Sequence, residues 1–596
     1  MQATQPLDPT VEAGAAPLSP RTACVLALAG AAVFLWLASP QLEAPGLEYD
    51  EVHQACGAFG WLGVQSSLFS LTHVGTAPLF TMHYSGALKT AIYGLWMRCS
   101  GAEFSVLNWR WLGLVFAALG VALLPWLLRR RLSVWPMLLL MLWVLTDVTL
   151  LLGARHDRGP VALAFLLRVL LIGVLFGRPM GAALSRRAWV LAGVLLGLAT
   201  WEKLPNALML APLCWVLAQQ ARPWGAALCA VAGGLIGAAP IALANGMSLA
   251  HGQGLFSLHE VSGENPYTIA LWLQQMGDML TTGSGGLARA NMLGMRDASN
   301  GVGGAAGPVI ELALVALLFV MLIVLAWRSG SAALRAATGS ALAIVVVLPL
   351  MPEIATEHHH LLLLPFLPLA TALALSSPSH AKTHLLQIQD AALCAPHPKT
   401  PSPRLRAGPV RIQDSSSANP NTPSPRLRTA LGVLCCACVL VRVPTLWETQ
   451  QALRDTPVAS GAGFNPEFTR FAELAAAEGP NTRVLAAGWG IATQVHCLAQ
   501  GAPNKVAELY WQAPSADAIL HAAGDAHRMI LVSPLNLRGV NKLRRDAFFS
   551  IAASLAPPPP ELVQNQAAAW RRVPPAPPWS NFTNLRVETF EKLIRH

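Results

Sequence analysis

Three acids and a histidine lie close together in a short stretch of an otherwise apolar sequence. The stretch "GLEYDEVHQACG", residues 46 to 57, holds Glu48, Asp50 and Glu51, followed by His53. A positioned carboxylate can take the proton from a hydroxyl group that attacks an electrophilic carbon, which typically contributes about 10²- to 10⁴-fold to a rate. The same acids could instead be a solvated helix exit, and the stretch alone leaves both interpretations open.

A second acidic site, Asp157, lies in "GARHDRGP" at 153 to 160. Asp50 and Asp157 could together hold a divalent cation, because hard cations prefer oxygen ligands, although two carboxylates without a third fixed ligand are a weak indication. Asp157 could also bind the molecule whose hydroxyl group attacks. Burial beside Glu51 would raise the pKa of Asp50 and make it a better base at neutral pH, because both effects disfavour the ionised form.

The elements that position these residues are expected to be membrane helices. The chain has 596 residues, of which 54% are hydrophobic and 12% charged, and the apolar residues form long blocks. A hydrocarbon core about 30 Å thick requires roughly 20 apolar residues per helix, so the fold class is an α-helical polytopic membrane protein with about eleven spans. The expected spans lie near residues 23–39, 111–128, 133–152, 160–177, 188–201, 204–218, 225–244, 309–327, 336–351, 361–377 and 429–443.

The net charge of +10 is explained by topology and not by nucleic-acid binding. Basic residues cluster in short loops between the apolar blocks, where cytoplasmic loops of membrane proteins collect them. With the N-terminus inside, the cytoplasmic loops carry Arg129 to Arg131, Arg186 and Arg187, and the basic residues of 382–428. The acids of the first loop, Asp157 and the later histidines then all lie on the extracytoplasmic face.

The chain divides into five predicted parts. These are a cytoplasmic tail at 1–21, a transmembrane catalytic domain at 22–377 with a first extracytoplasmic loop at 41–110, a low-complexity cytoplasmic loop at 378–428, the last transmembrane helix at 429–444, and an extracytoplasmic domain at 445–596. In the last part, "NTRVLAAGWG" and "HRMILVSPL" contain strand patterns and "IATQVHCLAQG" a helix pattern, which predicts a small α/β domain. The glycines of "GWG" are expected to serve a turn.

The combination of motifs resembles the C-type membrane glycosyltransferases, in particular glycosyltransferase family 39, which includes protein O-mannosyltransferases and lipid A aminoarabinose transferases. "EYDEVHQ" is similar to the family's first-loop motif, "RHDRGP" to its second acidic site, and "MHYSGALKTAIYGLWMRCSGAEFSVLNWRW" to the amphipathic part of the first loop. The similarity covers the order of elements over about residues 20 to 380. It implies the C-type fold and an enzyme that moves a sugar from a polyprenyl phosphate to an acceptor, usually with inversion.

The resemblance also implies roles for the acids. Asp50 matches the catalytic Asp and is expected to act as general base, Glu51 matches the neighbouring acid, and Asp157 matches the second-loop carboxylate.

A polyprenyl phosphate leaving group needs cations that stabilise its developing charge. Lys89 and Lys203 are the preferred candidates, because a lone ammonium in an apolar helix is costly, and Arg158 is a third. Snorkelling to the headgroups explains either lysine alone equally well.

Three further residues are candidates for contacting substrate. Tyr49 and His53 flank the acids of the first loop, and His358 belongs to "EHHH" at 357 to 360. Three consecutive histidines cannot all face one way on a helix, so this triplet alone does not form a metal cluster. Solvation at the interface is an equally good explanation of His358.

The sequence therefore predicts a hexosyl- or pentosyltransferase of the plasma (inner) membrane, with its active site on the extracytoplasmic face. Its expected partners are an undecaprenyl or dolichyl phosphate sugar, membrane lipids and an acceptor that the sequence does not identify, with no nucleic acid and no cofactor besides the divalent cation considered above. The main rival is a transporter or flippase, although such proteins usually place charges near the bilayer midplane within inverted repeats. An inactive scaffold with an interaction domain is a third possibility.

Overall fold

The computed structural model describes most of the chain from residue 17 to residue 593. The described ranges are 17–44, 46–64, 72–157, 160–178, 183–258, 268–293, 306–329, 331–351, 357–376, 424–454, 466–488, 490–503, 505–510, 512–535, 539–555, 569–575 and 577–593. The predicted low-complexity loop therefore lies outside the described residues, except for its last five.

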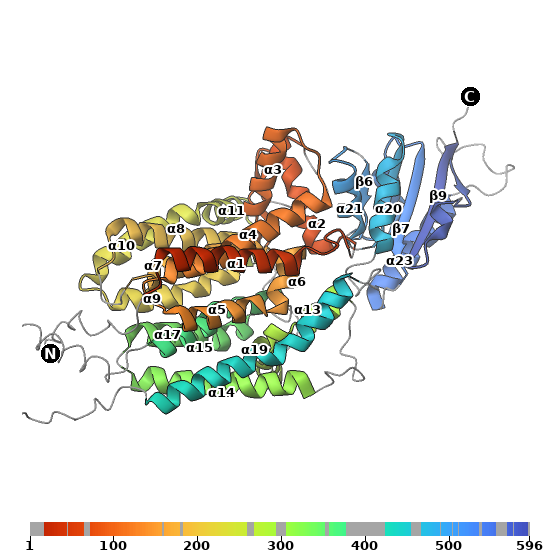
Figure 1. Ribbon diagram of the computed structural model, residues 1–596. Helices are drawn as coiled ribbons and strands as arrows, with labels where there is room; N and C mark the ends of the chain where they lie inside the picture. Colours follow the sequence, from red (N-terminus) through yellow and green to blue (C-terminus); the bar gives the residue numbers. More distant parts are fainter. Residues whose placement is uncertain are drawn as a thin grey trace, which may run out of the picture.

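Apolar helices form an elongated bundle, and each predicted span coincides with a helix or with a pair of consecutive helices (Figure 1). The helices are α1 (Pro20–Ala38), α4 (Val106–Leu128), α5 (Val134–Leu145), α6 (Val148–His156), α7 (Val161–Phe176), α8 (Arg186–Glu202), η3 (Leu204–Met209), α9 (Leu210–Ala218), α10 (Pro223–Gly237), α11 (Ala239–Ala250), α14 (Ala306–Arg328), α15 (Ala332–Val347), η6 (Leu348–Leu350), α16 (Glu357–His360), α17 (Phe366–Ser376) and α19 (Pro425–Arg454). Between α11 and α14 lie η4 (Phe256–Leu258), α12 (Ile269–Leu280), η5 (Thr282–Ser284) and α13 (Gly286–Leu293).

Five of the described helices are individually long and apolar enough to cross a membrane, or seven spans if each of two bent pairs counts as one. The predicted span at 133–152 is one of these pairs, since α5 and α6 meet at an angle of 56°. Asp147 explains the break, because its Oδ1 accepts the amide proton of Leu150 at 2.8 Å and so begins a new helix. The chain is thus a multi-pass membrane protein whose helices are more broken than the apolar blocks suggest.

The outer surface of the bundle carries large apolar side chains. Trp327 is 88% exposed, Trp224 83% and Leu228 73%. Soluble proteins do not gather such side chains on helix after helix, whereas a lipid environment accommodates them. The bundle surface therefore fits the expected contact with membrane lipids.

The first loop folds into a compact unit at one end of the bundle. It contains α2 (Tyr49–Cys56), η2 (Gly57–Leu62) and α3 (Leu88–Ser100), with the short strands β1 (His73–Val74), β2 (Ala77–Pro78), β3 (Phe80–Met82) and β4 (Ser85–Gly86) between them. The strands pair antiparallel as β1 with β2 and β3 with β4. The N-terminal end of α1 and the basic end of α4 lie together at the opposite end, where the Leu18 amide donates to the Arg129 carbonyl at 2.8 Å.

The C-terminal region forms a five-stranded sheet with helices on both faces. The strand order is β6-β5-β7-β9-β8. Here β5 pairs in parallel with β6 and β7, whereas β9 is antiparallel to β7 and β8. The elements are α20 (Pro466–Ala477), β5 (Thr482–Ala486), α21 (Ile491–Leu498), β6 (Val506–Glu508), α22 (Ala516–Ala523), β7 (Arg528–Pro534), α23 (Gly539–Leu555), β8 (Ala569–Val573), η8 (Trp579–Asn581) and β9 (Leu585–Leu593).

Alternating side chains of the central strands supply the two cores of this domain. Val484 and Ile530 face α20 and α21, whereas Leu485 and Leu531 face α22 and α23. This period of two is the pattern expected of strands buried on both faces. Two of the strands, β5 and β7, and the helix α21 lie where the sequence predicted them.

The C-terminal domain lies against the first loop at the end of the bundle, with α21 facing α2 (Figure 1). The Leu47 amide, just before α2, donates to Thr469 Oγ1 at 2.7 Å, and Gln494 Nε2 donates to the Leu47 carbonyl at 3.2 Å. The Gln500 side chain bonds both the amide and the carbonyl of Phe104, at 2.7 and 3.1 Å. The domain is therefore joined to the loop by specific polar contacts.

Candidate active site

The acids of the first loop begin a helix. Glu48 precedes α2, and its Oε2 accepts the amide protons of Asp50 at 2.7 Å and Glu51 at 3.3 Å. A side chain that accepts from the first free amides of a helix is an N-cap, and its negative charge also suits that end of the helix dipole. Glu48, which the sequence left without a role, thus fixes where α2 starts.

Burial separates Asp50 from its neighbours. Glu48 and Glu51 are 1% and 0% exposed, whereas Asp50 is partly exposed. A general base must reach the proton that it removes, so accessibility is a condition for that role. Among these three acids, Asp50 is the one that a substrate could reach.

Glu51 is held by a buried arginine. Arg110 Nε donates to Glu51 Oε1 at 2.7 Å and Nη2 to Oε2 at 2.8 Å, with both side chains 0% exposed. Arg110 also donates to the carbonyls of Leu42 and Gly46. Such a bidentate pair compensates the charge of Glu51. The expected influence of Glu51 on Asp50, as a neighbouring like charge, is weakened by this pair, because the guanidinium offsets the charge of Glu51.

Asp157 joins three elements. It ends α6 in the left-handed conformation, with φ 48° and ψ 40°. Its Oδ1 accepts the amide protons of Val161 and Ala162 at the start of α7, at 2.7 and 2.9 Å. Its Oδ2 lies 2.6 Å from Lys89 Nζ of α3, and both side chains are at most 1% exposed. The C-terminal end of α6 is thus tied to the first loop by a buried ion pair.

Gln54 brings the two acidic sites together. Its Nε2 donates to the Asp50 carbonyl at 3.0 Å and to the Asp157 carbonyl at 3.1 Å. The side chain is 1% exposed. The segments that carry Asp50 and Asp157 are about a hundred residues apart in the chain, and they meet at the side-chain amide of Gln54.

The residues present do not fit the divalent cation considered from the sequence. Both carboxylate oxygens of Asp157 are already engaged: Oδ1 accepts the two amide protons, and Oδ2 lies in an ion pair with the Lys89 ammonium. A cation there would meet the Lys89 ammonium and would need Asp157 to release its partners. Within the described ranges no group of three or more His, Cys, Asp or Glu side chains is arranged for a metal.

The two lysines expected at the donor phosphate lie on elements that contact each other: Lys89 is in α3, and Lys203 directly follows α8. Lys89 Nζ also lies 3.7 Å from the centroid of the Trp109 ring, a cation–π contact. Glu202, directly before Lys203, accepts the Leu88 amide proton at 3.0 Å and so caps α3. Lys203 itself is 4% exposed and pairs through its backbone with Ser85. Snorkelling to the headgroups therefore does not describe either buried lysine.

The histidine triplet approaches the same region through Tyr84. The Tyr84 backbone carbonyl accepts the amide proton of Leu204 at 2.9 Å. The centroid of the Tyr84 ring lies 5.8 Å from the centroid of the His359 ring. His358 Nε2 lies 3.1 Å from His359 Nε2, and both side chains are buried. His358 is therefore a packed residue and not one solvated at the interface.

Tyr49 and His53 contact each other on α2. Tyr49 Oη and His53 Nδ1 are 2.7 Å apart, as expected of residues one helical turn from each other. Tyr49 also packs against Gly490, since a Cβ at Gly490 would lie 3.3 Å from Tyr49 Cβ. Gly490 has φ +85°, which favours glycine, so it serves a turn that contacts the residue before Asp50. Arg158, the third candidate for the phosphate, lies outside the described residues.

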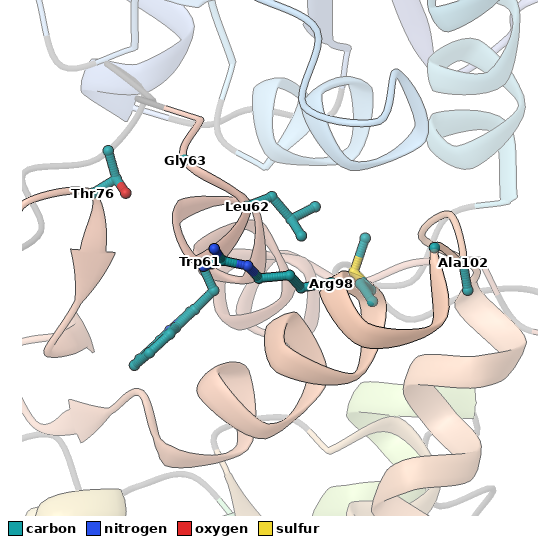
Figure 2. Close-up of a pocket in the computed structure, with 8 residues that line it drawn as sticks. Trp61, Leu62, Gly63, Thr76, Arg98 and Ala102 are labelled. Carbon is teal, nitrogen blue, oxygen red and sulfur yellow. The ribbon is translucent and has the colours of Figure 1, made fainter.

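A hollow of about 460 Å³ lies on the first loop, apart from the acids. Trp61, Leu62 and Gly63 line it from η2 and the turn after it, and Arg98 lines it from α3 (Figure 2). Its lining contains none of the candidate catalytic residues.

Comparison with known proteins gives matches in structure only. No protein-family model matches the sequence, and no curated protein sequence matches it. The crystal structure of ArnT from Cupriavidus metallidurans bound to undecaprenyl phosphate aligns with a TM-score of 0.53 and 12% identity, over 96% of this chain and 98% of that one. ArnT from the same organism in the apo state aligns with a TM-score of 0.52 and 13% identity, over 89% and 94%. The chain has the fold of ArnT. The resemblance to the C-type membrane glycosyltransferases is thereby confirmed at the level of the fold.

Several residues of the site escaped sequence reasoning. Gln54 carries no charge and gave no signal. Glu202 was visible beside Lys203, but its role as the cap of α3 depends on a contact across 114 positions. The aromatic partner of Lys89, Trp109, lies in the "NWRW" motif beside Arg110, and only the fold shows which cation each of them contacts.

Proposed function

We propose that this chain is an integral-membrane glycosyltransferase that moves a sugar from a polyprenyl phosphate carrier to an acceptor, with Asp50 as general base. The observation that carries the proposal is the junction at Gln54, which joins the partly exposed Asp50 to the Asp157–Lys89 pair. This junction lies in a fold shared with ArnT, one structure of which is described as bound to undecaprenyl phosphate.

The proposed reaction is a single displacement at the anomeric carbon. An acceptor hydroxyl oxygen attacks that carbon, its proton passes to the Asp50 carboxylate, and the bond between the sugar and the phosphate oxygen breaks. The bonding electrons leave with the polyprenyl phosphate, and attack from the face opposite this leaving group inverts the anomeric configuration. Asp50 supplies the base, and the buried partners around it fix its position.

Cations receive the developing negative charge on the phosphate. We assign this role to Lys89 and Lys203, with Arg158 as a third contributor. An ammonium has three N–H donors, so Lys89 can hold Asp157 with one of them and still donate to a phosphate oxygen. Asp157 then acts as a positioning residue for Lys89. Tyr49, His53 and His358 are proposed to shape the substrate site.

The same proposal assigns the membrane and the partners. The chain would lie in the plasma (inner) membrane with the site on the extracytoplasmic face, and would use an undecaprenyl or dolichyl phosphate sugar. The C-terminal domain contacts α2 directly, through Cys56 and Thr493, so we propose that it contributes to acceptor recognition. The chemistry assigned to Asp50 and Lys89 requires no divalent cation.

Release of polyprenyl phosphate in detergent distinguishes this function from lipid transport. Micelles have no two sides, so a flippase has no measurable action there, whereas a transferase still consumes its donor. The purified chain should convert at least one of a panel of polyprenyl phosphate hexoses and pentoses to free polyprenyl phosphate when acceptor extract is added. Translocation of these lipids in proteoliposomes, with no donor consumed in detergent, would show that the chain is a transporter.

A further inference from the structure

Two cysteines meet where the C-terminal domain contacts the first loop. Cys56 is the last residue of α2, and Cys497 lies in α21, 441 positions later. Their Sγ atoms are 3.1 Å apart, and the side chains are 2% and 0% exposed. A disulfide bond is about 2.05 Å long, so a shift of about 1 Å would bring the two sulfur atoms to bonding distance.

Contacts that do not involve the sulfur atoms also hold this segment against the first loop. Gln494 is one turn before Cys497 and bonds the Leu47 carbonyl, and Gln500 is three residues after it and bonds the Phe104 backbone. The segment that contains Cys497 is thus held to the first loop on both sides of this cysteine. The cysteines lie between these contacts, which is where a covalent bond would fix the interface.

We propose that Cys56 and Cys497 form a disulfide that joins the first loop to the C-terminal domain. One thiolate attacks a sulfur of an external disulfide donor, either a protein or a small molecule, and the second thiolate displaces the donor from the mixed disulfide. The two protein thiols are oxidised to a disulfide, the donor disulfide is reduced to two thiols, and the two protons lost by the protein thiols pass to the donor sulfur atoms. The proposal rests on both segments lying outside the cytoplasm, where disulfides persist, and it is independent of sugar transfer.

Burial affects how this pair reacts. It raises the pKa of the Cys56 thiol and so lowers the share of reactive thiolate in the docked state. The same burial, with side chains 2% and 0% exposed, protects the bond from reductants once it has formed. The consequence for the site is positional, because the bond would anchor the helix that carries Asp50 to the C-terminal domain.

Peptide mapping of the full chain tests the disulfide directly. Membranes are lysed in N-ethylmaleimide, and the denatured protein is cleaved without reductant by chymotrypsin, which cuts after Tyr49, Phe59, Trp489 and Leu498. Residues 50–59 and 490–498 are then single peptides with one cysteine each. We expect one mass for the linked pair, which separates into the two peptides after reduction.

Two variants complete the test. Cys497→Ala should abolish the linked mass and leave Cys56 labelled by N-ethylmaleimide, whereas Cys99→Ser, which removes an exposed thiol of the same loop, should keep the link. If Cys497→Ala does not accumulate, the presence or absence of the linked peptide mass in the wild-type protein still decides whether the disulfide forms. Recovery of both wild-type peptides as N-ethylmaleimide adducts, from cells with an intact disulfide-forming pathway, would overturn the proposal.

Discussion

Buried charges at this site are compensated by specific partners. Glu51 has Arg110, and Asp157 has Lys89. Removing one member of a buried pair leaves the other uncompensated and typically costs about 3–5 kcal/mol, whereas replacing both costs much less. The two pairs therefore stabilise the arrangement around Asp50, and the pair that contains Lys89 is also assigned to the donor.

A double-mutant cycle separates these two roles of Lys89. Lys89→Met and Asp157→Asn should each lower the thermal midpoint of the purified protein, and the double variant should regain much of the loss because no uncompensated charge remains. Donor use should not recover in the double variant, since the phosphate has lost its cation. Lys542→Met, at an exposed lysine of the C-terminal domain, should change neither measurement. If the double variant transferred sugar at the native rate, the assignment of Lys89 to the donor phosphate would be wrong.

Residue types were predictable at this scale, and partners were not. The motifs around Asp50 and Asp157 predicted two acidic sites on one face, and the fold places both segments at one junction. The pairing of Glu51 with Arg110 spans 59 positions and depends on how α4 approaches α2. A single sequence contains no signal for a contact of this kind.

Helices were predictable at the scale of elements because long apolar blocks leave few alternatives. The breaks were less visible. Asp147 interrupts a block that was expected to be one span, although an Asp in an apolar block is itself a cue for a helix start. The sheet order was beyond reach, since β9 comes last in the chain and yet pairs between β7 and β8.

The helix α21 gives the interface with the first loop a dependence on pH. The His496 ring packs edge-on against Phe59 with centroids 5.4 Å apart, and burial lowers the pKa of His496 from its usual 6.5 to about 4. The unfolded state therefore binds more protons between these values, so stability is fully present above pH 6.5 and is lost as the pH falls to about 4. The total effect is about 3 kcal/mol.

Thermal unfolding at two pH values tests this dependence. The wild-type midpoint should fall between pH 7.5 and pH 4.5 by more than that of His496→Gln, because the variant lacks the titrating ring. His521→Gln, at an exposed histidine of the same domain, should behave as wild type. An equal fall in the wild type and in His496→Gln would mean that another group causes the pH dependence.

The whole molecule combines a membrane bundle with a domain that contacts the helix carrying the proposed base. The sequence predicted both parts but not their contact, because Gly490 gave only a turn signal and Gln494 and Gln500 gave none. The match to the ArnT structure covers 96% of this chain, so it includes the C-terminal domain as well as the bundle. The candidate site thus lies where three parts meet: the first loop, the C-terminal end of α6 and the C-terminal domain.

The most direct test of the account is the rate of sugar transfer by Asp50→Asn. Asparagine keeps the shape of the side chain but cannot accept the proton, so the rate should fall about 10²- to 10⁴-fold. Glu43→Gln, which neutralises an exposed acid of the same loop, should transfer at the native rate. Membranes that contain Asp50→Asn at wild-type abundance and transfer sugar as fast as the wild type would contradict the assignment of Asp50 as the base.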